Sequence, residues 1–407
     1  MPDFAKHTLL VTVSGDDRPG VTSTLFDAIA DVGAEVLDLE QVVVRGHLTL
    51  ALLLDAGPQN RRLREVVASV ATSLGMQVSV EPGSGDNAPR RGGRAAVVVL
   101  AAPLLASAVA AITTRIAAHG ANIDRIRRLS RYPVTTVEFD ISGADVSVLR
   151  TELSLEAAVR GVDIAVAPAG LARRGRRLVV IDVDSTLIQD EVIELLAAHA
   201  NREADVAIVT SAAMRGELDF AESLRARVAL LAGLPVSVLD EVRAAIRLTP
   251  GARTLVRTLK RLGFTVAAVS GGFIEVVRPL AEELDIDHAH ANRLEVRDGF
   301  LTGALVGEIV DRQGKAEALR RFAAEESLPL SRTVAIGDGA NDLDMLAAAG
   351  LGIAFNAKPI VREQADTTVN VPYLDAVLYL LGITREEIEE ADEADGTPTP
   401  APPLPAR

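Results

Sequence analysis

The sequence predicts an α/β chain in which two small, similar modules precede a larger domain built on a parallel sheet. Two consecutive segments each show strand and helix patterns in the order βαββαβ, which indicates an internal duplication. The third segment contains short Val/Ile-rich runs, each followed by Gly or Asp and then by a helical pattern. Two stretches rich in Gly, Pro and charge, Pro82–Arg94 and Pro168–Arg177, separate the three segments and are interpreted as linkers.

The first module spans residues 1–81. Apolar residues at helical spacing predict two helices, and Arg45-Gly46 predicts a hairpin-like turn between the two middle strands. In chain order, the expected elements are the strand His7–Ser14, the helix Val21–Val32, the strands Glu35–Val44 and His47–Leu54, the helix Gln59–Leu74 and the strand Gln77–Val80.

The second module spans residues 95–167 and repeats this order. The expected elements are the strand Ala96–Leu100, the helix Ala106–His119, the strands Asn122–Ser130 and Val134–Ile141, the helix Val146–Val159 and the strand Val162–Ala167. Each module is expected to be a small sheet with its helices on one face.

The third segment, residues 178–383, has strand runs that are apolar at nearly every position. Such runs are typical of strands buried on both faces of a parallel sheet. The expected strands are Leu178–Ile181, Thr265–Val269, Thr333–Ile336 and Leu351–Ala354. Residues 188–248 have a mostly helical pattern. An insertion of this length is expected to be structured, and a lid over a ligand site is a natural use for it.

The composition excludes several classes of protein. The formal net charge is -14, and the short basic run Arg173–Arg177 is interpreted as a linker, not as a nucleic-acid surface. The absence of cysteine excludes disulfides and thiol catalysis. We expect no secretory signal and no membrane span, and a cytoplasmic location. The tail, residues 386–407, begins acidic, ends in Thr-Pro repeats and is expected to be disordered.

Acidic side chains follow two of the expected strands. Asp182 and Asp184 leave the end of the run Leu178–Ile181, and the segment IGDGANDLDM supplies Asp338, Asn341 and Asp342 after another. Taken alone, each motif is also typical of a turn or a helix cap. Because ligands of parallel sheets bind beyond the carboxyl ends of the strands, the two motifs together predict a set of hard oxygen ligands that suits Mg²⁺.

Two further segments supply groups that suit a phosphate. Ser270 ends the run Thr265–Val269 and precedes Gly271 and Gly272, which offers a hydroxyl and exposed backbone N–H groups. Lys315 begins a helical pattern. Each of these features alone is weak evidence, since a Ser followed by two glycines more often forms an ordinary strand-to-helix turn and a single lysine is more often exposed to solvent. They gain weight as parts of an ordered set.

In this order, the four segments resemble the motifs of the haloacid dehalogenase superfamily of phosphotransferases. DVDST resembles its first motif, Ser270 its second, Lys315 its third and GDGAND its fourth, over residues 178–383. The narrower resemblance is to the phosphoserine phosphatases, through Glu191 in DVDSTLIQDE and through Met214, Phe220 and Arg227 in the insertion. It implies a Rossmann-like phosphatase core with a helical cap at about residues 188–248.

The two N-terminal modules resemble ACT domains, which are ferredoxin-like modules that bind amino acids. The segment GDDRPGV, residues 15–21, matches the usual ligand loop of these domains after the first strand. The second module has Ala101-Ala-Pro-Leu104 at the corresponding place, a departure from the pattern. The resemblance implies an amino-acid effector, with feedback by serine through the first module, and a homodimer formed through the ACT-like modules.

The resemblance also implies the chemistry: hydrolysis of O-phospho-L-serine, the last step of serine biosynthesis, through an aspartyl-phosphate. Asp182 would be the nucleophile and Asp184 the general acid and base. Mg²⁺ would be held by Asp182, Asp338 and the backbone carbonyl of Asp184, and Asp342 would support it directly or through water.

The implied substrate contacts come from both the core and the insertion. Ser270, the N–H of Gly271, Lys315 and Asn341 would bind the phosphoryl oxygens. Glu191 would bind the ammonium group of the substrate and Arg227 its carboxylate. Met214 and Phe220 would close over the substrate and exclude water.

Two other functions compete with this one. The first is a phosphatase of the same superfamily that acts on a sugar phosphate or phosphoglycolate; the charges of Glu191 and Arg227 argue against it, because together they match an amino acid. The second is an amino-acid sensor whose phosphatase domain is inactive, against which the full set of catalytic acids argues.

Overall fold

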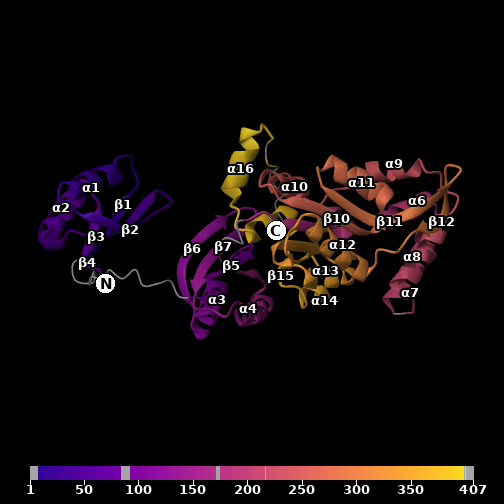
Figure 1. Cartoon of the computed structure of the whole chain (residues 1–407), viewed down its shortest axis with the longest axis horizontal. Coiled ribbons are helices and arrows are strands. Elements are labelled where there is room, and N and C mark those ends of the chain that lie inside the picture. Colours follow the sequence, from indigo (N-terminus) through magenta and orange to yellow (C-terminus); the bar gives the residue numbers. More distant parts are fainter. Residues whose placement is uncertain (1–7, 84–91, 171–174, 216, 398, 400–407) are drawn as a thin grey trace. The chain divides into compact units, whose positions relative to one another are not determined.

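The computed structural model of the chain describes residues 8–83, 92–170, 175–215, 217–397 and 399 (Figure 1). The chain forms two compact units, Met1–Arg90 and Arg91–Arg407, and each is described here by itself. Most of the first predicted linker and part of the second lie outside the described residues. Among the described residues, no helix is both long enough and apolar enough to cross a bilayer.

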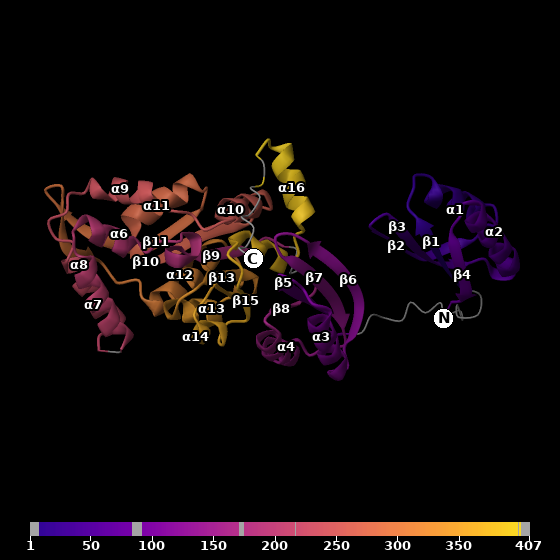
Figure 2. The ribbon, with the colours of Figure 1, turned by 180° about the vertical axis from the view of Figure 1, so that it is seen from behind.

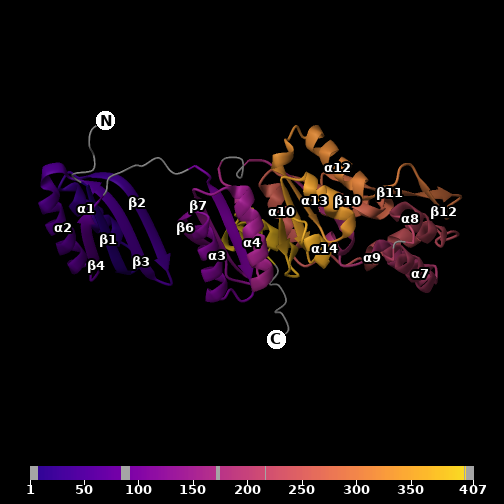
Figure 3. The same ribbon diagram turned by 90° about the horizontal axis from the view of Figure 1, so that it is seen from below.

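The first unit is a four-stranded antiparallel sheet with strand order β2-β3-β1-β4. The predicted βαββαβ order is confirmed. The elements are β1 (Thr8–Asp16), α1 (Val21–Ala30), β2 (Glu35–Val44), β3 (His47–Asp55), α2 (Asn60–Ser73) and β4 (Gln77–Pro82). The GDDRPGV segment connects β1 to α1, and both helices lie on one side of the sheet (Figure 3).

The core of this unit follows from the alternation of side chains along its strands. Val11 and Val13 of β1 are buried with Leu25 of α1 and Leu63 of α2. The neighbouring position Leu10 is 40% exposed. Only one face of the sheet is therefore covered by apolar neighbours, as expected for a module of this kind.

The second unit begins with a module of the same order, in which the strands are arranged β6-β7-β5-β8. Its elements are β5 (Ala95–Ala101), α3 (Ala106–Ala118), β6 (Asn122–Ser130), β7 (Thr135–Ser142), α4 (Val146–Arg160) and β8 (Asp163–Pro168). Every residue of β5 is buried.

The complete burial of β5 arises because both faces of this second sheet are covered. Val97 and Val99 point into a core with α3 and α4. Val98 and Leu100 belong instead to the main core of the C-terminal domain, together with Leu378. The uninterrupted apolar run of β5 differs from the alternating run of β1 for this reason.

Hydrogen bonds and an ion pair also connect the second module to the C-terminal domain. Asp163 at the start of β8 is buried and accepts a hydrogen bond from the backbone N–H of Asn370 at 2.9 Å and from its side-chain amide at 2.6 Å. The hydroxyl of Thr367 donates to the carbonyl oxygen of Ile164 at 2.6 Å. Arg150 of α4 pairs with Asp366 at 2.8 Å. The second module is thus built onto the edge of the following domain.

The C-terminal domain has a seven-stranded sheet of order β12-β11-β10-β9-β13-β14-β15. All neighbours are parallel except β11 and β12. The strands are β9 (Leu178–Asp182), β10 (Thr265–Phe273), β11 (His288–Arg297), β12 (Phe300–Val306), β13 (Thr333–Gly337), β14 (Leu351–Phe355) and β15 (Thr367–Val369). The four predicted strands are confirmed, whereas the β11–β12 hairpin and the short β15 were not predicted.

Helices cover both faces of this sheet (Figures 1 and 2). Alternate residues of β9 enter different cores: Leu178 and Val180 pack with α12 and α13, and Val179 and Ile181 pack with α10 and α11. The helices are α10 (Ala252–Arg261), α11 (Ile274–Glu283), α12 (Arg312–Glu325), α13 (Leu343–Ala348), α14 (Pro359–Arg362) and α15 (Val377–Leu380). Burial on both faces explains the uniformly apolar strand runs.

The insertion between β9 and β10 is helical, as predicted. It contains α6 (Val192–His199), α7 (Glu203–Met214), α8 (Phe220–Ala229) and α9 (Val238–Ala245). A capping box, in which Asp219 accepts from the N–H of Glu222 and Glu222 accepts from the N–H of Asp219, begins α8.

The prediction that the tail is disordered from residue 386 is wrong for its first part. Residues Arg385–Ala394 form the helix α16, which is capped by Thr384. Asp392 on this helix is buried and pairs with Arg257 at 2.6 Å and with Arg261 at 2.5 Å, and these cations hold the pKa of Asp392 down at about 2. Two arginines of α10, distant in sequence, therefore stabilise an acidic helix whose one large apolar side chain, Ile388, is buried in the core of the C-terminal domain.

Candidate active site

The first predicted motifs meet at the carboxyl edge of the parallel sheet. In the strand register, Asp182 of β9 pairs with Val269 of β10, and Ile181 pairs with Ile336 of β13. The residues that follow these positions, Ser270 and Asp338, therefore leave the sheet beside Asp182. This is the edge at which parallel sheets bind ligands.

Lys315 lies at the centre of the buried charges. Its ammonium group donates to Oδ1 of Asp182 at 2.5 Å and to Oδ1 of Asp342 at 2.7 Å, and all three side chains are buried. Burial alone would lower the pKa of Lys315, but attraction from the two carboxylates outweighs it and raises the pKa. Lys315 is therefore a fixed cation under this edge.

Three carboxylates gather around the same point. One oxygen each from Asp182, Asp338 and Asp342 lie within 4.8 Å of one another. Burial and repulsion from Asp342 raise the pKa of Asp182 well above its ordinary value, and the same two causes raise that of Asp338 to about 6. One ammonium does not balance three carboxylates, so the donor set fits a hard divalent cation such as Mg²⁺.

Asp184 is held by two donors just beyond the strand. Its Oδ1 accepts from the N–H of Val192 and its Oδ2 from the hydroxyl of Ser270, both at 2.8 Å. Burial raises the pKa of Asp184 although both hydrogen bonds oppose the rise. Its neighbour Ser185 has a φ of 59°, which turns the chain sharply after Asp184. A half-buried carboxyl with a raised pKa can exchange a proton with a ligand.

The Ser270–Gly272 turn requires its glycines. The N–H of Gly272 donates to the hydroxyl of Ser270 at 2.7 Å, and a Cβ at Gly272 would lie 2.9 Å from Oδ2 of Asp184. A Cβ at Gly271 would lie 3.1 Å from the ring of Phe220. A second tight turn follows β13, where Asn341 folds back over Gly339. These turns bring Asn341 and Gly271 to the same edge as Ser270.

Glu191 and Arg227 belong to two different helical segments of the insertion. Glu191 precedes α6 and accepts from the hydroxyl of Ser185 at 2.9 Å. Part of its surface stays exposed, but the surrounding protein removes part of the hydration of its carboxyl group, and this loss together with the charge of Asp184 raises its pKa to about 7. Arg227 is half-buried on α8 and bonds only the backbone oxygen of Ser223, at 3.4 Å, among described residues. Burial lowers the pKa of Arg227, and the charges of Glu191 and Asp184 oppose this effect. No ion pair joins these two described side chains, yet Arg227 is close enough for the charges of Glu191 and Asp184 to act on it.

The remaining two predicted residues lie at adjoining helix ends. Phe220 is the first residue of α8 and its ring borders Gly271. Met214 is the last residue of α7, and its side chain lies outside what the structure describes.

Comparison with known proteins gives the family. Over 387 residues, 95% of this chain and 94% of the relative, the sequence is 64% identical to a phosphoserine phosphatase of Streptomyces coelicolor. It is 52% identical to the phosphoserine phosphatase SerB2 of Mycobacterium tuberculosis over 96% of this chain and 97% of that one.

This chain belongs to the phosphoserine phosphatase family. The model of haloacid dehalogenase-like hydrolases matches residues 179–347, and ACT domain models match residues 7–81 and 94–167. The chain is accordingly a phosphoric monoester hydrolase with two ACT domains.

Solved structures agree with the fold. A probable phosphoserine phosphatase of Vibrio cholerae is 34% identical, with a TM-score of 0.56 over 74% of this chain and 88% of that one. A haloacid dehalogenase family hydrolase of Salmonella enterica is 26% identical, with a TM-score of 0.61 over 70% of this chain and 98% of that one.

Three neighbours of the site were not predicted from the sequence. Thr186 donates to Asp338 at 3.3 Å, and Ser185 donates to Glu191. Both belong to the DVDST motif, so their place in the motif was a usable signal. The third, Asn292, lies in the unpredicted strand β11, and no local pattern marks it.

Proposed function

We propose that this phosphoserine phosphatase family member hydrolyses O-phospho-L-serine to L-serine and phosphate. The observation that carries the proposal is the meeting of Asp182, Ser270 and Lys315 at one sheet edge that faces Glu191 and Arg227. The first group suits a phosphoryl group, and the second suits the ammonium and carboxylate of an amino acid. A sugar phosphate offers nothing for both opposite charges to bind.

In the first step, an oxygen of the Asp182 carboxylate attacks phosphorus and the bond from phosphorus to the seryl oxygen breaks. Asp184 gives its proton to the departing oxygen, which becomes the hydroxyl of serine. The raised pKa of Asp184 supports this role, because it keeps the proton available. Asp182 then carries the phosphoryl group.

In the second step, a water oxygen attacks the phosphorus of the aspartyl-phosphate and Asp184 takes a proton from that water. The bond from phosphorus to Asp182 breaks, so phosphate leaves and the carboxylate is restored. Ser270, the N–H of Gly271, Lys315 and Asn341 hold the phosphoryl oxygens, and their positive or donor groups stabilise the charge that builds there. Phe220 and Met214 exclude bulk water.

The proposed cofactor is Mg²⁺, held by Asp182, Asp338 and the backbone carbonyl of Asp184, with Asp342 bound directly or through water. Its positive charge would offset the repulsion between the Asp182 carboxylate and the substrate phosphate. The excess of carboxylates over cations at this point supports the assignment.

A homodimer and an amino-acid effector at the ACT domains are part of the proposal. The edge strand β2 supports a self-association surface, since it carries Leu39, Val42, Val43 and Val44, each of which is exposed by at least 45%. The serine-biosynthetic role and the cytoplasmic location remain predictions from the family resemblance.

The test is release of phosphate from O-phospho-L-serine, phosphoglycolate and glucose 6-phosphate, each with Mg²⁺ and with EDTA. Phosphoserine should be the best substrate by kcat/KM, and EDTA should abolish turnover. Addition of L-serine tests the effector, since inhibition that fails to compete with substrate would indicate a second site. Equal rates on all three substrates would contradict the specificity.

The variant Asp182→Asn should lower kcat by at least about 1,000-fold, because the amide oxygen is a poor nucleophile. The variant should remain folded, since it also removes one of the carboxylates that repel each other. Circular dichroism provides the control. Retained turnover in the purified variant would exclude the covalent route.

A further inference from the structure

Asn292 joins two of the segments that form the candidate active site. It lies in β11, with 2% of its surface exposed, and uses both ends of its amide. Its Nδ2 donates to the carbonyl oxygen of Gly271, and its Oδ1 accepts from the N–H of Val310, both at 2.8 Å. One buried side chain thus connects the phosphate turn after β10 to the segment before α12.

The first contact controls the direction of a peptide group. The register between β10 and β11 shifts between Ser270 and Phe273, so the two glycines bulge out of the strand. In a trans peptide, the carbonyl of Gly271 and the N–H of Gly272 point in opposite directions. When Asn292 holds the carbonyl on one side, the N–H is aimed at the hydroxyl of Ser270 on the other.

The orientation of this peptide group also affects the hydroxyl of Ser270 and its partner in the candidate active site. Because the hydroxyl of Ser270 accepts from Gly272, its own proton is directed to Asp184. Asn292 therefore orients the donor that holds the proposed acid and base, although it touches neither the carboxylate nor the substrate position.

The second contact sets the start of the helix that carries Lys315. Val310 precedes Asp311, which caps α12 by accepting from the N–H of Gly314 at 2.9 Å. The N–H of Lys315 donates to the backbone oxygen of Asp311 at 3.0 Å. A displacement of Val310 would therefore move the first turn of α12, and with it the ammonium group that contacts Asp182.

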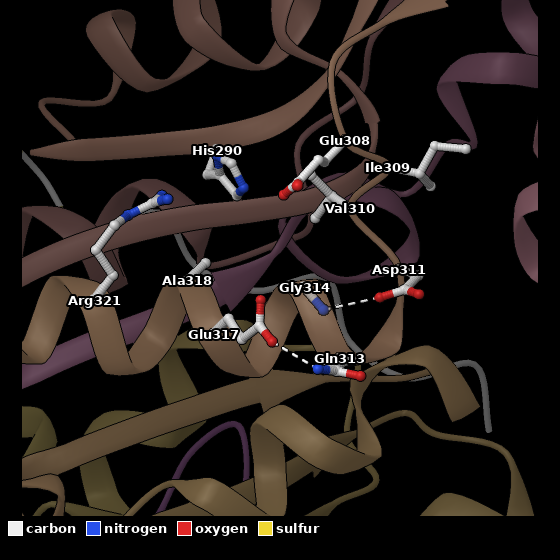
Figure 4. Close-up of a pocket in the computed structure, with 10 residues that line it drawn as sticks. All are labelled: His290, Glu308, Ile309, Val310, Asp311, Gln313, Gly314, Glu317, Ala318 and Arg321. Carbon is white, nitrogen blue, oxygen red and sulfur yellow. Dashed lines mark hydrogen bonds between the residues drawn. The ribbon is translucent and has the colours of Figure 1, made fainter.

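The segment that contains Val310 also borders a cavity. Its outer side faces a cavity of about 530 Å³ that is bordered by His290 of β11 and by Glu317 and Arg321 of α12 (Figure 4). The side chain of Val310 is buried in the core below this segment, and the hydrogen bond to Asn292 fixes the direction of its backbone N–H.

We propose that Asn292 is a positioning residue for phosphoryl transfer, which fixes the Ser270–Gly272 turn and the start of α12 relative to each other. The inference rests on the proposed function for the identity of the phosphate site. The test uses p-nitrophenyl phosphate, so that it does not depend on phosphoserine being the substrate.

Asn292→Ala should lower kcat for p-nitrophenyl phosphate by about 100-fold, because small displacements of reacting groups have effects of this size. Inhibition by inorganic phosphate should weaken about tenfold, the equivalent of about one hydrogen bond. The Mg²⁺ concentration needed for half-maximal activity should change less than kcat, since Asn292 itself contacts no carboxylate of the metal cluster.

Asn292→Asp separates positioning from folding. An ionised carboxylate can accept from Val310 but cannot donate to Gly271, whereas a protonated carboxyl can do both. The kcat of this variant, divided by that of the unaltered enzyme, should therefore rise as the pH falls from about 8 to about 5.5. A role in stability alone predicts no such recovery of kcat in folded protein.

Thr367→Val is the matched control. It also removes one buried hydrogen bond from the same unit, but at the junction with the second module. It should lower the melting temperature and leave kcat unchanged. If both Asn292 variants fold and keep kcat within about threefold of the unaltered enzyme, the proposal is overturned. If neither folds while Thr367→Val does, Asn292 has a structural role only and the proposal is equally overturned.

Discussion

Lys315 reaches Asp182 across 133 positions of sequence, with its ammonium nitrogen 2.5 Å from the carboxylate. The contact joins the first turn of α12 to the end of β9, and both side chains are buried. Lys315 also forms an ion pair with Asp342, so a single ammonium group stabilises two carboxylates that repel each other.

Replacing this cation should therefore affect both stability and rate. Lys315→Met should lower the free energy of unfolding in EDTA by about 3 kcal/mol, because two buried carboxylates lose their partner. The loss of unfolding free energy should be smaller in the presence of Mg²⁺, because the bound cation supplies positive charge to the same carboxylates. Chemical denaturation and kcat measure the two effects, and Arg320→Met, at an exposed position of the same helix, is the control. Equal destabilisation with and without Mg²⁺ would contradict the account.

Arg227 should discriminate between substrates. Arg227→Ala should lower kcat/KM for phosphoserine by about 100-fold, because a charge-assisted contact to the carboxylate is lost. It should change the value for p-nitrophenyl phosphate little, since that substrate has no carboxylate. Arg225→Ala, at an exposed position of the same helix, should alter neither. Equal losses on the two substrates would remove Arg227 from the carboxylate site.

Glu191 should make phosphoserine binding depend on pH. Its pKa of about 7 means that the carboxyl of the free enzyme becomes ionised as the pH rises through neutrality, and only the ionised form attracts an ammonium group. KM for phosphoserine should therefore fall between about pH 6 and pH 8, with the midpoint lowered when Mg²⁺ adds positive charge nearby.

p-Nitrophenyl phosphate controls for ionisation of the phosphate group, and Glu191→Gln should remove the additional pH dependence seen with phosphoserine. The same pH profile for both substrates in the unaltered enzyme would show that Glu191 does not bind the ammonium group.

Mg²⁺ should stabilise the enzyme more at pH 7.5 than at pH 5.5. A raised carboxyl pKa means that the folded state binds more protons than the unfolded state, so stability in EDTA is lost as the pH rises through the window from 3.8 to about 6 for Asp338. Mg²⁺ replaces these protons. At 100 times its Kd it should add about 2.7 kcal/mol.

Thermal unfolding at the two pH values, with Mg²⁺ and with EDTA, measures this effect. Asp338→Asn should abolish most of the shift caused by Mg²⁺. A shift of the same size at both pH values would contradict competition between the proton and the cation.

The sequence predicted those elements whose burial can be inferred from the residues of a single segment. The strand runs identified the buried parallel sheet, and the residues after them identified Asp182, Ser270 and Asp338. The hairpin β11–β12 was missed because it is only partly buried, and α16 was missed because its acids are paired with Arg257 and Arg261, distant in sequence. Asn292 depends in the same way on partners that no local pattern contains.

The burial of both faces of the second ACT sheet has a consequence for how the chain unfolds. Three modules can be recognised in the sequence, but Val98 and Leu100 share their core with Leu378. A chain cut at about residue 92 would keep that shared core, whereas one cut at about residue 176 would expose it and leave Asn370 without Asp163. The number of cooperative folding units is therefore smaller than the number of modules, and the last two modules denature together.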